Sequence, residues 1–513
     1  MPAATPISMI TMPGWTNGAN RDADPYQLEV TESPDAENVD FGVRGRVSKR
    51  KGYASFDEVA ALASAPRAMK SWKTVAGSET LFYIADDGTI LVGTGAPLAD
   101  STKDVGTWSL NEEYRVGIAS LNDVVYFTSL GAGANIPSYD GSSWVDVATT
   151  IFDGTAIRFP KAQHLVTHVD RIFAANVENT GGTRFASRVH WSDALDAETW
   201  TASNFIDFDP DDGQQITAMH EFGENLVIFK DHRLQLLTGK SEDSFERYNL
   251  DSEIGTTAPG TIVPFSTMLY FFDPSTGVHR FDGSAIYPVD DAINQYLLDG
   301  QNRTQSHKAH AYIHEGKYYL SLAWGTNASP NRTFVLDLTT NSWTEYTYGL
   351  QASAVFGNKR LGGGPNGVLG IFTMHTGLDD DGVAIEAYFY TPWVSPADTP
   401  SAAHRLRRLD TIWEAIDDID VRVEMFRDFS RQSAIYDQAI DTDPSGSLWG
   451  TAVWGLARWG SPRDEVYSKT TGWGNLLWSA VQFKVSVTGL TDDFALNRLT
   501  MIVSTRARVR GEI

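Results

Sequence analysis

Cysteine is absent from the sequence. Disulfide bonds, cysteine-based zinc sites and thiol nucleophiles are therefore excluded together. Residues 1–15 contain neither a basic segment nor a long apolar one, so we expect no signal peptide. No uninterrupted apolar run approaches the ~18 residues of a membrane-spanning helix, so we expect no such helix.

Basic residues are scarce relative to acidic ones: 41 Lys and Arg face 65 Asp and Glu, which gives a formal charge of −24. Solubility alone explains such a surplus. A protein that grips DNA over a broad surface needs clustered Lys and Arg, so the composition argues against that class. A wall past which DNA slides without adhering would tolerate a negative field.

Turn-forming and aromatic residues are abundant. Aromatic residues make up 12% of the chain and there are 44 glycines, a composition typical of short strands joined by tight turns. The 513 residues are too many for one ordinary core, so two or three domains are expected.

A β-hairpin within residues 188–239 recurs along the chain. Its strands are the apolar runs 226–229 and 234–237, which flank a polar turn. Similar runs, each preceded by polar residues, lie at 81–84, 124–127, 172–173, 268–272, 318–320 and 368–372. The copies are roughly 42 to 55 residues apart, the length of a four-stranded propeller blade. Two β-sandwiches are the alternative, but they would not require so regular a recurrence.

We therefore predict an all-β chain with a β-propeller of six or seven blades and a C-terminal β-sandwich. The expected boundaries are an N-terminal extended or β segment at 1–72 that contributes to the propeller or to assembly contacts, the propeller at 73–377 and the sandwich at 378–513. A Trp-Gly-rich insertion at about 445–478 interrupts the sandwich. Residues 291–299 predict one short helix with Asp290 as its N-cap.

Period-two alternation marks the sandwich strands. Val421, Val423 and Met425 fall on one face of the segment 418–428, whereas 499–505 is more continuously apolar and suits a buried strand. Both patterns predict strands that pack against a common core.

Three groups of residues are candidates for contacts with neighbouring subunits or proteins. Each group has a simpler explanation as well, namely a solvated strand edge or face for the arginines and packing against the sandwich itself for the tryptophans. The candidates are Arg44, Arg46, Arg50, Arg405, Arg407, Arg408, Trp449, Trp454 and Trp459.

Catalytic patterns are weak. His164 and His168 have the spacing of a helical metal pair, but the residues between them favour a strand, so we interpret both as structural. Residues 207–218 begin like a calcium loop but lack its sixth-position Gly and twelfth-position Glu, which favours a surface turn. Residues 192–200 resemble the aspartate box of sialidase propellers without its Gly, and that box forms a turn. We therefore predict no catalytic, cofactor or metal site, and no enzyme.

The order of three segments resembles the propeller-bearing tail proteins of bacteriophages, including tail nozzle and packaged-DNA stabilisation proteins. The opening segments 25–28, 32–40 and 47–53 are similar to that family's start. Residues 188–200, 212–217 and 226–239 look like its blade, and residues 381–382 and 386–388 with 405–409 look like its C-terminal sandwich.

The resemblance implies a structural virion protein without cofactors. Such a protein would form a ring homo-oligomer, often of six copies, below the portal or adaptor of the tail. Genomic DNA would pass through its lumen without sequence-specific binding. The alternative that the residues leave open is a carbohydrate-binding or glycan-cleaving propeller that recognises a receptor through Trp and Tyr.

Overall fold

The computed structural model describes residues 7–25, 27–57, 64–94, 115–130, 135–148, 159–179, 182–250, 253–396, 403–414, 420–441, 465–471 and 477–506. It divides into two compact units. The sandwich unit comprises Met1–Ala54, Phe334–Thr347 and His375–Ile513, and the propeller unit comprises Ser55–Thr333 and Tyr348–Met374. Both units are discontinuous, so this division differs from the consecutive segments expected with boundaries at residues 72 and 377.

The described part of the propeller unit contains antiparallel strands from seven successive sheets, which we call blades 1 to 7. Blade 1 has β8 (Pro66–Lys73), β9 (Glu79–Ala85) and β10 (Ile90–Gly93), blade 2 has β11 (Gly117–Leu121), β12 (Val124–Thr128), β13 (Asn135–Tyr139) and β14 (Trp144–Ala148), and blade 3 has β15 (Lys161–His168), β16 (Arg171–Glu178), β17 (Arg184–Ser192) and β18 (Trp200–Asp207). Blade 4 has β19 (Ile216–Phe222), β20 (Asn225–Lys230), β21 (Leu234–Thr238) and β22 (Glu246–Asn249), and blade 5 has β23 (Val263–Phe265), β24 (Met268–Asp273), β25 (Gly277–Phe281) and β26 (Ile286–Pro288). In this unit blade 6 has β27 (His310–His314) and β28 (Lys317–Leu322), and blade 7 has β31 (Ala352–Phe356), β32 (Lys359–Gly363) and β33 (Ile371–Met374). Strand β7 (Tyr53–Asp57) ends in this unit and β29 (Arg332–Asp337) begins in it.

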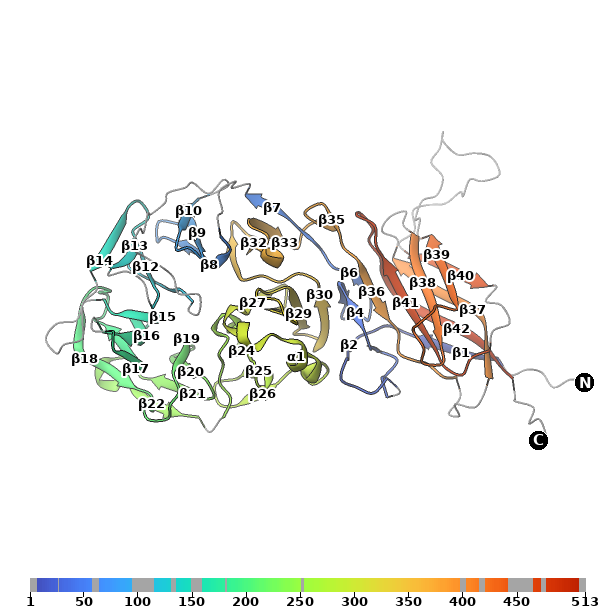
Figure 1. Ribbon diagram of the computed structural model, residues 1–513, viewed down its shortest axis with the longest axis horizontal. Helices are drawn as coiled ribbons and strands as arrows, with labels where there is room; N and C mark the ends of the chain where they lie inside the picture. Colours follow the sequence, from blue (N-terminus) through green and yellow to red (C-terminus); the bar gives the residue numbers. More distant parts are fainter. Residues whose placement is uncertain are drawn as a thin grey trace, which may run out of the picture. The chain divides into compact units, whose positions relative to one another are not determined.

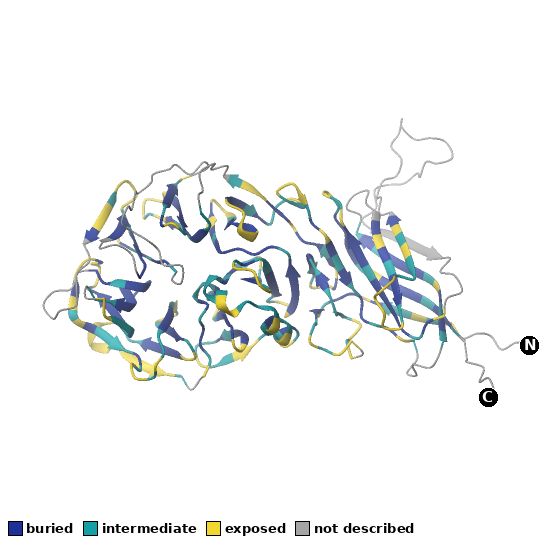
Figure 2. Cartoon of the chain, in the orientation of Figure 1, coloured by how far each residue is buried: buried dark blue, intermediate teal, exposed yellow. Residues whose placement is uncertain are grey.

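The blades follow one another around a closed ring (Figure 1). Among the described residues, buried apolar clusters join neighbouring blades; blades 3 and 4, for example, bury Phe173, Trp191 and Ile228 in one cluster. Blade 7 closes the ring on blade 1, because Leu361 and Leu81 belong to a single buried cluster. The central strands are consequently buried on both faces (Figure 2), which confirms the predicted propeller.

The recurrent apolar run is the second strand in blades 1 to 6, where it corresponds to β9, β12, β16, β20, β24 and β28. The seventh copy, at residues 368–372, occupies a different position in its blade. Part of it forms β33, the third strand of blade 7, and the second strand is β32 with the sequence KRLGG. That strand lacks an apolar run because Gly362 lies against Leu350 and Met374, and Gly363 against Pro66, where a Cβ atom would clash.

Helices are few and short among the described residues. They are α1 (Asn294–Gly300), η1 (Glu242–Ser244), η2 (Pro259–Thr261), η3 (Arg303–Lys308) and η4 (Pro365–Gly367). The predicted helix at 291–299 is α1, but its N-cap is Ile293 and not Asp290. The Asp290 carboxylate instead accepts hydrogen bonds from the Val278 amide and the Asn294 side chain. No helix in the described part of the chain is both long and apolar enough to span a membrane.

The sandwich unit packs two sheets face to face, and both recruit strands from the N-terminal 54 residues. Its strands are β1 (Ile7–Met12), β2 (Gly18–Ala19), β3 (Glu32–Ser33), β4 (Ala36–Glu37), β5 (Val39–Phe41), β6 (Val47–Lys49), β30 (Ser342–Tyr346), β34 (Asp379–Asp380), β35 (Val383–Ala384), β36 (Ala387–Tyr390), β37 (Ala403–Glu414), β38 (Asp420–Arg427), β39 (Tyr436–Asp441), β40 (Glu465–Thr471), β41 (Val481–Val487) and β42 (Ala495–Arg506).

One sheet of the sandwich has the order β40-β37-β42-β6-β5, with β1 also paired to β42, and the other has the order β39-β38-β41-β36-β4. Val421, Val423 and Met425 all face the core between them, so the predicted sandwich and its buried face are confirmed. The N-terminal segment was expected to contribute to the propeller or to assembly contacts, and the sequence did not indicate that its strands join the sandwich sheets. Strands of two to six residues pair there with partners more than 300 residues away, and no local pattern reveals such pairing.

A buried ion pair within the sandwich unit joins its N-terminal segment to the segment that begins at residue 375. The Arg50 guanidinium donates from Nη1 and Nη2 to the two oxygens of Asp380 at 2.8 and 2.6 Å, and from Nε to Asn38 Oδ1 at 2.7 Å. Beside this pair Asp381 donates its amide to the Tyr53 carbonyl. A Cβ on Gly52 would lie 1.7 Å from the Asp379 carbonyl oxygen, so this close approach requires glycine.

We predict that Arg50→Ala lowers the free energy of unfolding of the sandwich unit by about 3–5 kcal/mol, because it leaves the Asp380 carboxylate without its buried partner. Urea unfolding of the whole chain would measure the shift of that unit's transition. The matched control is Arg46→Ala, which breaks the exposed Arg46–Glu414 pair and should cost about 1 kcal/mol or less. Equal effects of the two substitutions would contradict the prediction.

We also predict that Leu361→Ala destabilises the propeller unit by about 2–5 kcal/mol, because it opens a cavity in the seam that closes the ring. Val355, on the adjacent strand, is 47% exposed, and Val355→Ala should change the stability by less than about 0.5 kcal/mol. Thermal unfolding would distinguish the two variants. A Leu361→Ala protein as stable as the control would show that blade 7 does not close the ring as described.

Candidate functional site

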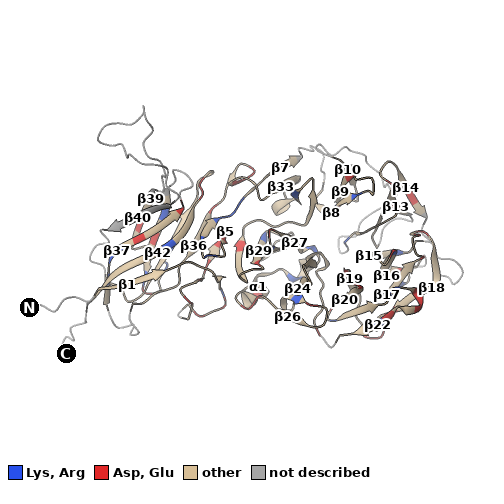
Figure 3. Cartoon of the chain, turned by 180° about the vertical axis from the view of Figure 1, so that it is seen from behind, with Lys and Arg blue, Asp and Glu red and all other residues tan. Residues whose placement is uncertain are grey.

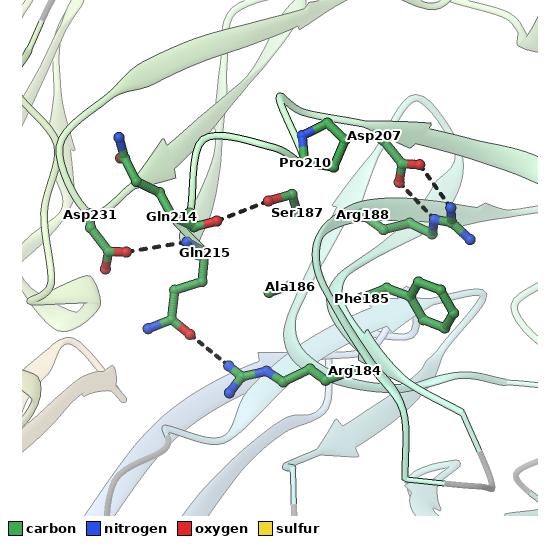
Figure 4. A pocket seen from close by; sticks show the side chains of 11 residues that line it. Arg184, Phe185, Ala186, Ser187, Arg188, Asp207, Pro210, Gln214, Gln215 and Asp231 are labelled. Atoms are coloured by element: carbon green, nitrogen blue, oxygen red, sulfur yellow. Dashed lines mark hydrogen bonds and ion pairs between the residues drawn. The ribbon is translucent and has the colours of Figure 1, made fainter.

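A cavity of about 560 Å³ lies in the propeller unit where the ends of blades 3 and 4 meet. Its walls come from the start of β17, the end of β18, the 208–215 connection and the β20–β21 turn (Figure 4). The lining residues are Arg184, Phe185, Ala186, Ser187, Arg188, Asp207, Pro210, Gly213, Gln214, Gln215 and Asp231. The size falls within the range of small-molecule sites.

A β-bulge at Asn176 shapes one wall of this cavity. Ala175 pairs with Val189 and Val177 pairs with Phe185, so residues 186–188 lie opposite Asn176 alone. Asn176 is buried and has a φ of +56°, a left-handed conformation that few residues other than Gly and Asn adopt. Bulges redirect side chains at sheet edges and are frequent beside binding sites. This bulge turns the start of β17 toward the cavity.

Amide side chains hold the Arg184 guanidinium at the rim. Arg184 donates from Nε to Asn176 Oδ1 at 2.6 Å, and from Nη2 to Gln163 Oε1 at 2.9 Å and Gln215 Oε1 at 2.8 Å. Asn176 Nδ2 in turn donates to the Ile216 carbonyl. The network fixes the positions of Arg184 and Gln215 across the seam between blades 3 and 4.

Arg188 is fixed in a different way. Its Nε and Nη2 donate to the two oxygens of Asp207, both at 2.7 Å. The guanidinium carbon lies 3.8 Å from the centre of the Phe205 ring and 4.5 Å from that of Phe185. The bidentate contact with the Asp207 carboxylate neutralises the charge of Arg188, and stacking between the two rings holds its guanidinium in place.

The 208–215 connection is held by a buried lysine. The Lys230 side chain is fully buried, and its Nζ contacts both oxygens of Asp212 at 2.7 Å and the carbonyls of Phe208 and Asp209. Asp209 also accepts from Gln235 and Arg247. The turn at residues 207–212 is therefore held in place, and the carboxylates of Asp207, Asp209 and Asp212 are bound by Arg or Lys side chains and, for Asp209, also by the Gln235 amide.

The two histidines with metal-pair spacing lie on strand β15, as the sequence predicted. His164 is buried, while His168 Nδ1 lies 3.1 Å from Glu221 Oε1. Burial, together with the nearby positive charge of Arg184, lowers the pKa of the His164 imidazole to about 3. Within the described ranges no group of three or more His, Asp or Glu side chains could hold a metal ion.

A second polar cluster lies near the ring's axis. Arg115, just before blade 2, donates to the His307, Lys308 and Ala309 carbonyls that precede blade 6. His310 Nε2 lies 2.9 Å from Ser353 Oγ. Burial lowers the pKa of His310 well below its usual value, as do the charges of Arg115 and Arg360. The cluster ties opposite blades together, so we interpret it as structural.

The candidate contact residues separate into three groups in the structure. Arg50 is buried in the sandwich unit, so the expectation that it contacts a partner is wrong. Its guanidinium forms an ion pair with Asp380 inside the fold. Arg44 and Arg46 are exposed, and Arg46 pairs with Glu414. Trp449, Trp454 and Trp459 lie outside the described residues, and the contacts expected of them stay predictions.

Arg405, Arg407 and Arg408 lie on β37, and none of them is buried. Arg407 Nε donates to Ser504 Oγ at 2.8 Å, and Arg408 pairs with Asp410 at 2.6 Å. Basic and acidic positions are both scattered over the two units (Figure 3). No pattern in the sequence predicted the cavity, although Gly213, Gln214 and Gln215 belong to the segment that resembles the phage blade.

Comparisons with known proteins leave the function open. Neither a protein-family model nor a curated protein sequence matches the chain. Among solved structures, the one described as "YCF48 bound to D1 peptide" is similar over 64% of this chain and 96% of that chain, with a TM-score of 0.36 and 7% identity. A likeness this distant carries no argument about what the chain does.

We predict that the propeller unit loses stability as the pH falls below about 6.5. Burial lowers the pKa of both His164 and His190 to about 3, whereas an unfolded histidine has a pKa near 6.5. Between these values the unfolded chain binds protons that the folded chain does not, so acid favours unfolding.

Urea unfolding at several pH values between about 7 and 5 would measure this effect. His164→Gln should reduce the slope of stability against pH. The control is the same substitution at the exposed His232, which tests the change of side chain alone. A stability that is constant over this range would contradict the prediction.

Proposed function

We propose that the chain is a non-enzymatic structural component of a bacteriophage tail, in which six copies form a ring, as a nozzle or tail tip, around the DNA ejection channel. The observation that supports it best is the order of the three motifs that resemble this family. Two of these motifs, residues 47–53 and the junction at Asp381-Gly382, meet in the sandwich unit around the Arg50–Asp380 pair. The resemblance therefore rests on segments with a shared structural role.

An exposed surface on the sandwich unit supports assembly with a second copy. Met9 and Arg408 both lie opposite Ile502 on adjacent strands, and Ile7 and Arg405 both lie opposite Ser504. Paired residues share one face of a sheet. Ile7 is 71% exposed and Met9 is 68% exposed. Apolar side chains beside arginines are typical of protein interfaces.

The charge is compatible with a DNA conduit. A net charge of −24 would repel the phosphate backbone, so DNA would pass through a ring of such subunits without adhering. In this proposal the adaptor or portal side of the tail and other tail proteins are the remaining partners, and the virion is the location.

We predict that the purified chain forms a particle of six times its 56.4 kDa mass, alone or on the adaptor ring. Mass photometry would measure the oligomer, and electron microscopy of the native particle would place it. Met9→Asp should dissociate the ring, because it puts a charge into an apolar contact. Val75→Asp, at a residue that is 93% exposed in the propeller unit, is the control.

Three results would contradict this proposal. They are a ring that Met9→Asp leaves intact, a native particle without the chain in its tail, and turnover of a sialoside or capsule polysaccharide by the purified protein. The last result would favour the glycan-cleaving propeller instead.

A further inference from the structure

The cavity between blades 3 and 4 plays no part in the proposed ring, and its chemistry is that of a ligand site. The four charged residues in its lining are Arg184, Arg188, Asp207 and Asp231, so their formal charges cancel. Arg188 and Asp207 also neutralise each other through two hydrogen bonds. A phosphate or a metal cation would meet no excess of opposite charge here, and a neutral ligand fits better.

The polar groups of the lining present fixed donors. Gln214 Oε1 accepts from the His232 amide at 2.9 Å, and Gln215 Oε1 accepts from Arg184 at 2.8 Å. Because each amide oxygen is held by the protein, each Nε2 group is oriented as a donor. Within the described part of the chain no hydrogen bond to either of these two Nε2 groups is seen.

Acceptors lie beside these donors. Asp231 accepts from the Gln215 amide through Oδ2, and the described residues show no hydrogen bond to its Oδ1. Ser187 Oγ donates to the Gln214 carbonyl at 2.9 Å and has lone pairs to accept with. Phe185 and Pro210 add apolar surface to the same walls. A hydroxyl group both donates and accepts, so the adjacent hydroxyl groups of a sugar ring would match these neighbouring donors and acceptors.

We propose that this cavity binds a neutral sugar unit, with Asp231 accepting from its hydroxyls and Gln214 and Gln215 donating to them. The site is built into the fold, since the Asn176 bulge and the buried Lys230 hold its two walls in place. Binding would occur in a single chain, so this inference stands independently of the ring.

Saturation-transfer NMR on the full chain would test it with glucose, galactose, mannose and N-acetylglucosamine, each titrated to tens of millimolar. At least one of these sugars should bind saturably. Asp231→Asn removes a charged acceptor and should weaken binding about tenfold or more. Ala186→Leu fills the cavity and should abolish binding. Ala76→Leu, on the exposed β8–β9 turn, is the matched control and should bind like the wild type.

Circular dichroism and thermal unfolding would establish that each variant is folded. If Ala186→Leu does not fold, Asp231→Asn alone decides the question. Inorganic phosphate and N-acetylneuraminic acid serve as charged comparators. Saturable binding by none of the neutral sugars, binding that the folded cavity variants leave unchanged, or displacement of the sugar by either anion would overturn the proposal.

Discussion

The propeller unit depends on one constraint: each of its small sheets is apolar on both faces and has to be covered on both by other sheets. A ring meets this requirement only if its last sheet also covers its first. The cluster that contains Leu81 and Leu361 does this, and Gly363 lies against Pro66 in the same seam. Gly363 is thus a consequence of closure, since blade 7 must approach blade 1 closely, whereas Gly362 makes room for Leu350 and Met374.

The sandwich unit meets the same constraint with segments from both ends of the sequence. The long strand β42 pairs with β1 on one side and with β37 on the other. A core assembled from such distant segments gains from a contact that fixes their register, and the Arg50–Asp380 pair provides one. Its charges are buried, so the pair favours this one arrangement over alternatives that would leave either charge unpaired.

The sequence was informative where a structural element has a local signature. The second strand of blades 1 to 6 is buried on both faces, so it appears as a short apolar run at a regular spacing. The alternation of Val421, Val423 and Met425 likewise shows a half-buried strand. The burial of Arg50 could not be predicted, because no local pattern distinguishes a buried arginine from a solvated one. Nor could the cavity, which depends on the backbone conformation of Asn176.

The seam between blades 3 and 4 shows why a cavity occurs there. Its interior holds a buried apolar cluster, yet at one end the bulge at Asn176 separates β17 from its partner strand. A left-handed asparagine costs free energy, and it persists only where its surroundings hold it. Here Arg184 and the Ile216 carbonyl bind its side chain, while Lys230 anchors the opposite wall through Asp212. Because polar contacts fix both walls, the space between them stays open without weakening the apolar seam on which the ring depends.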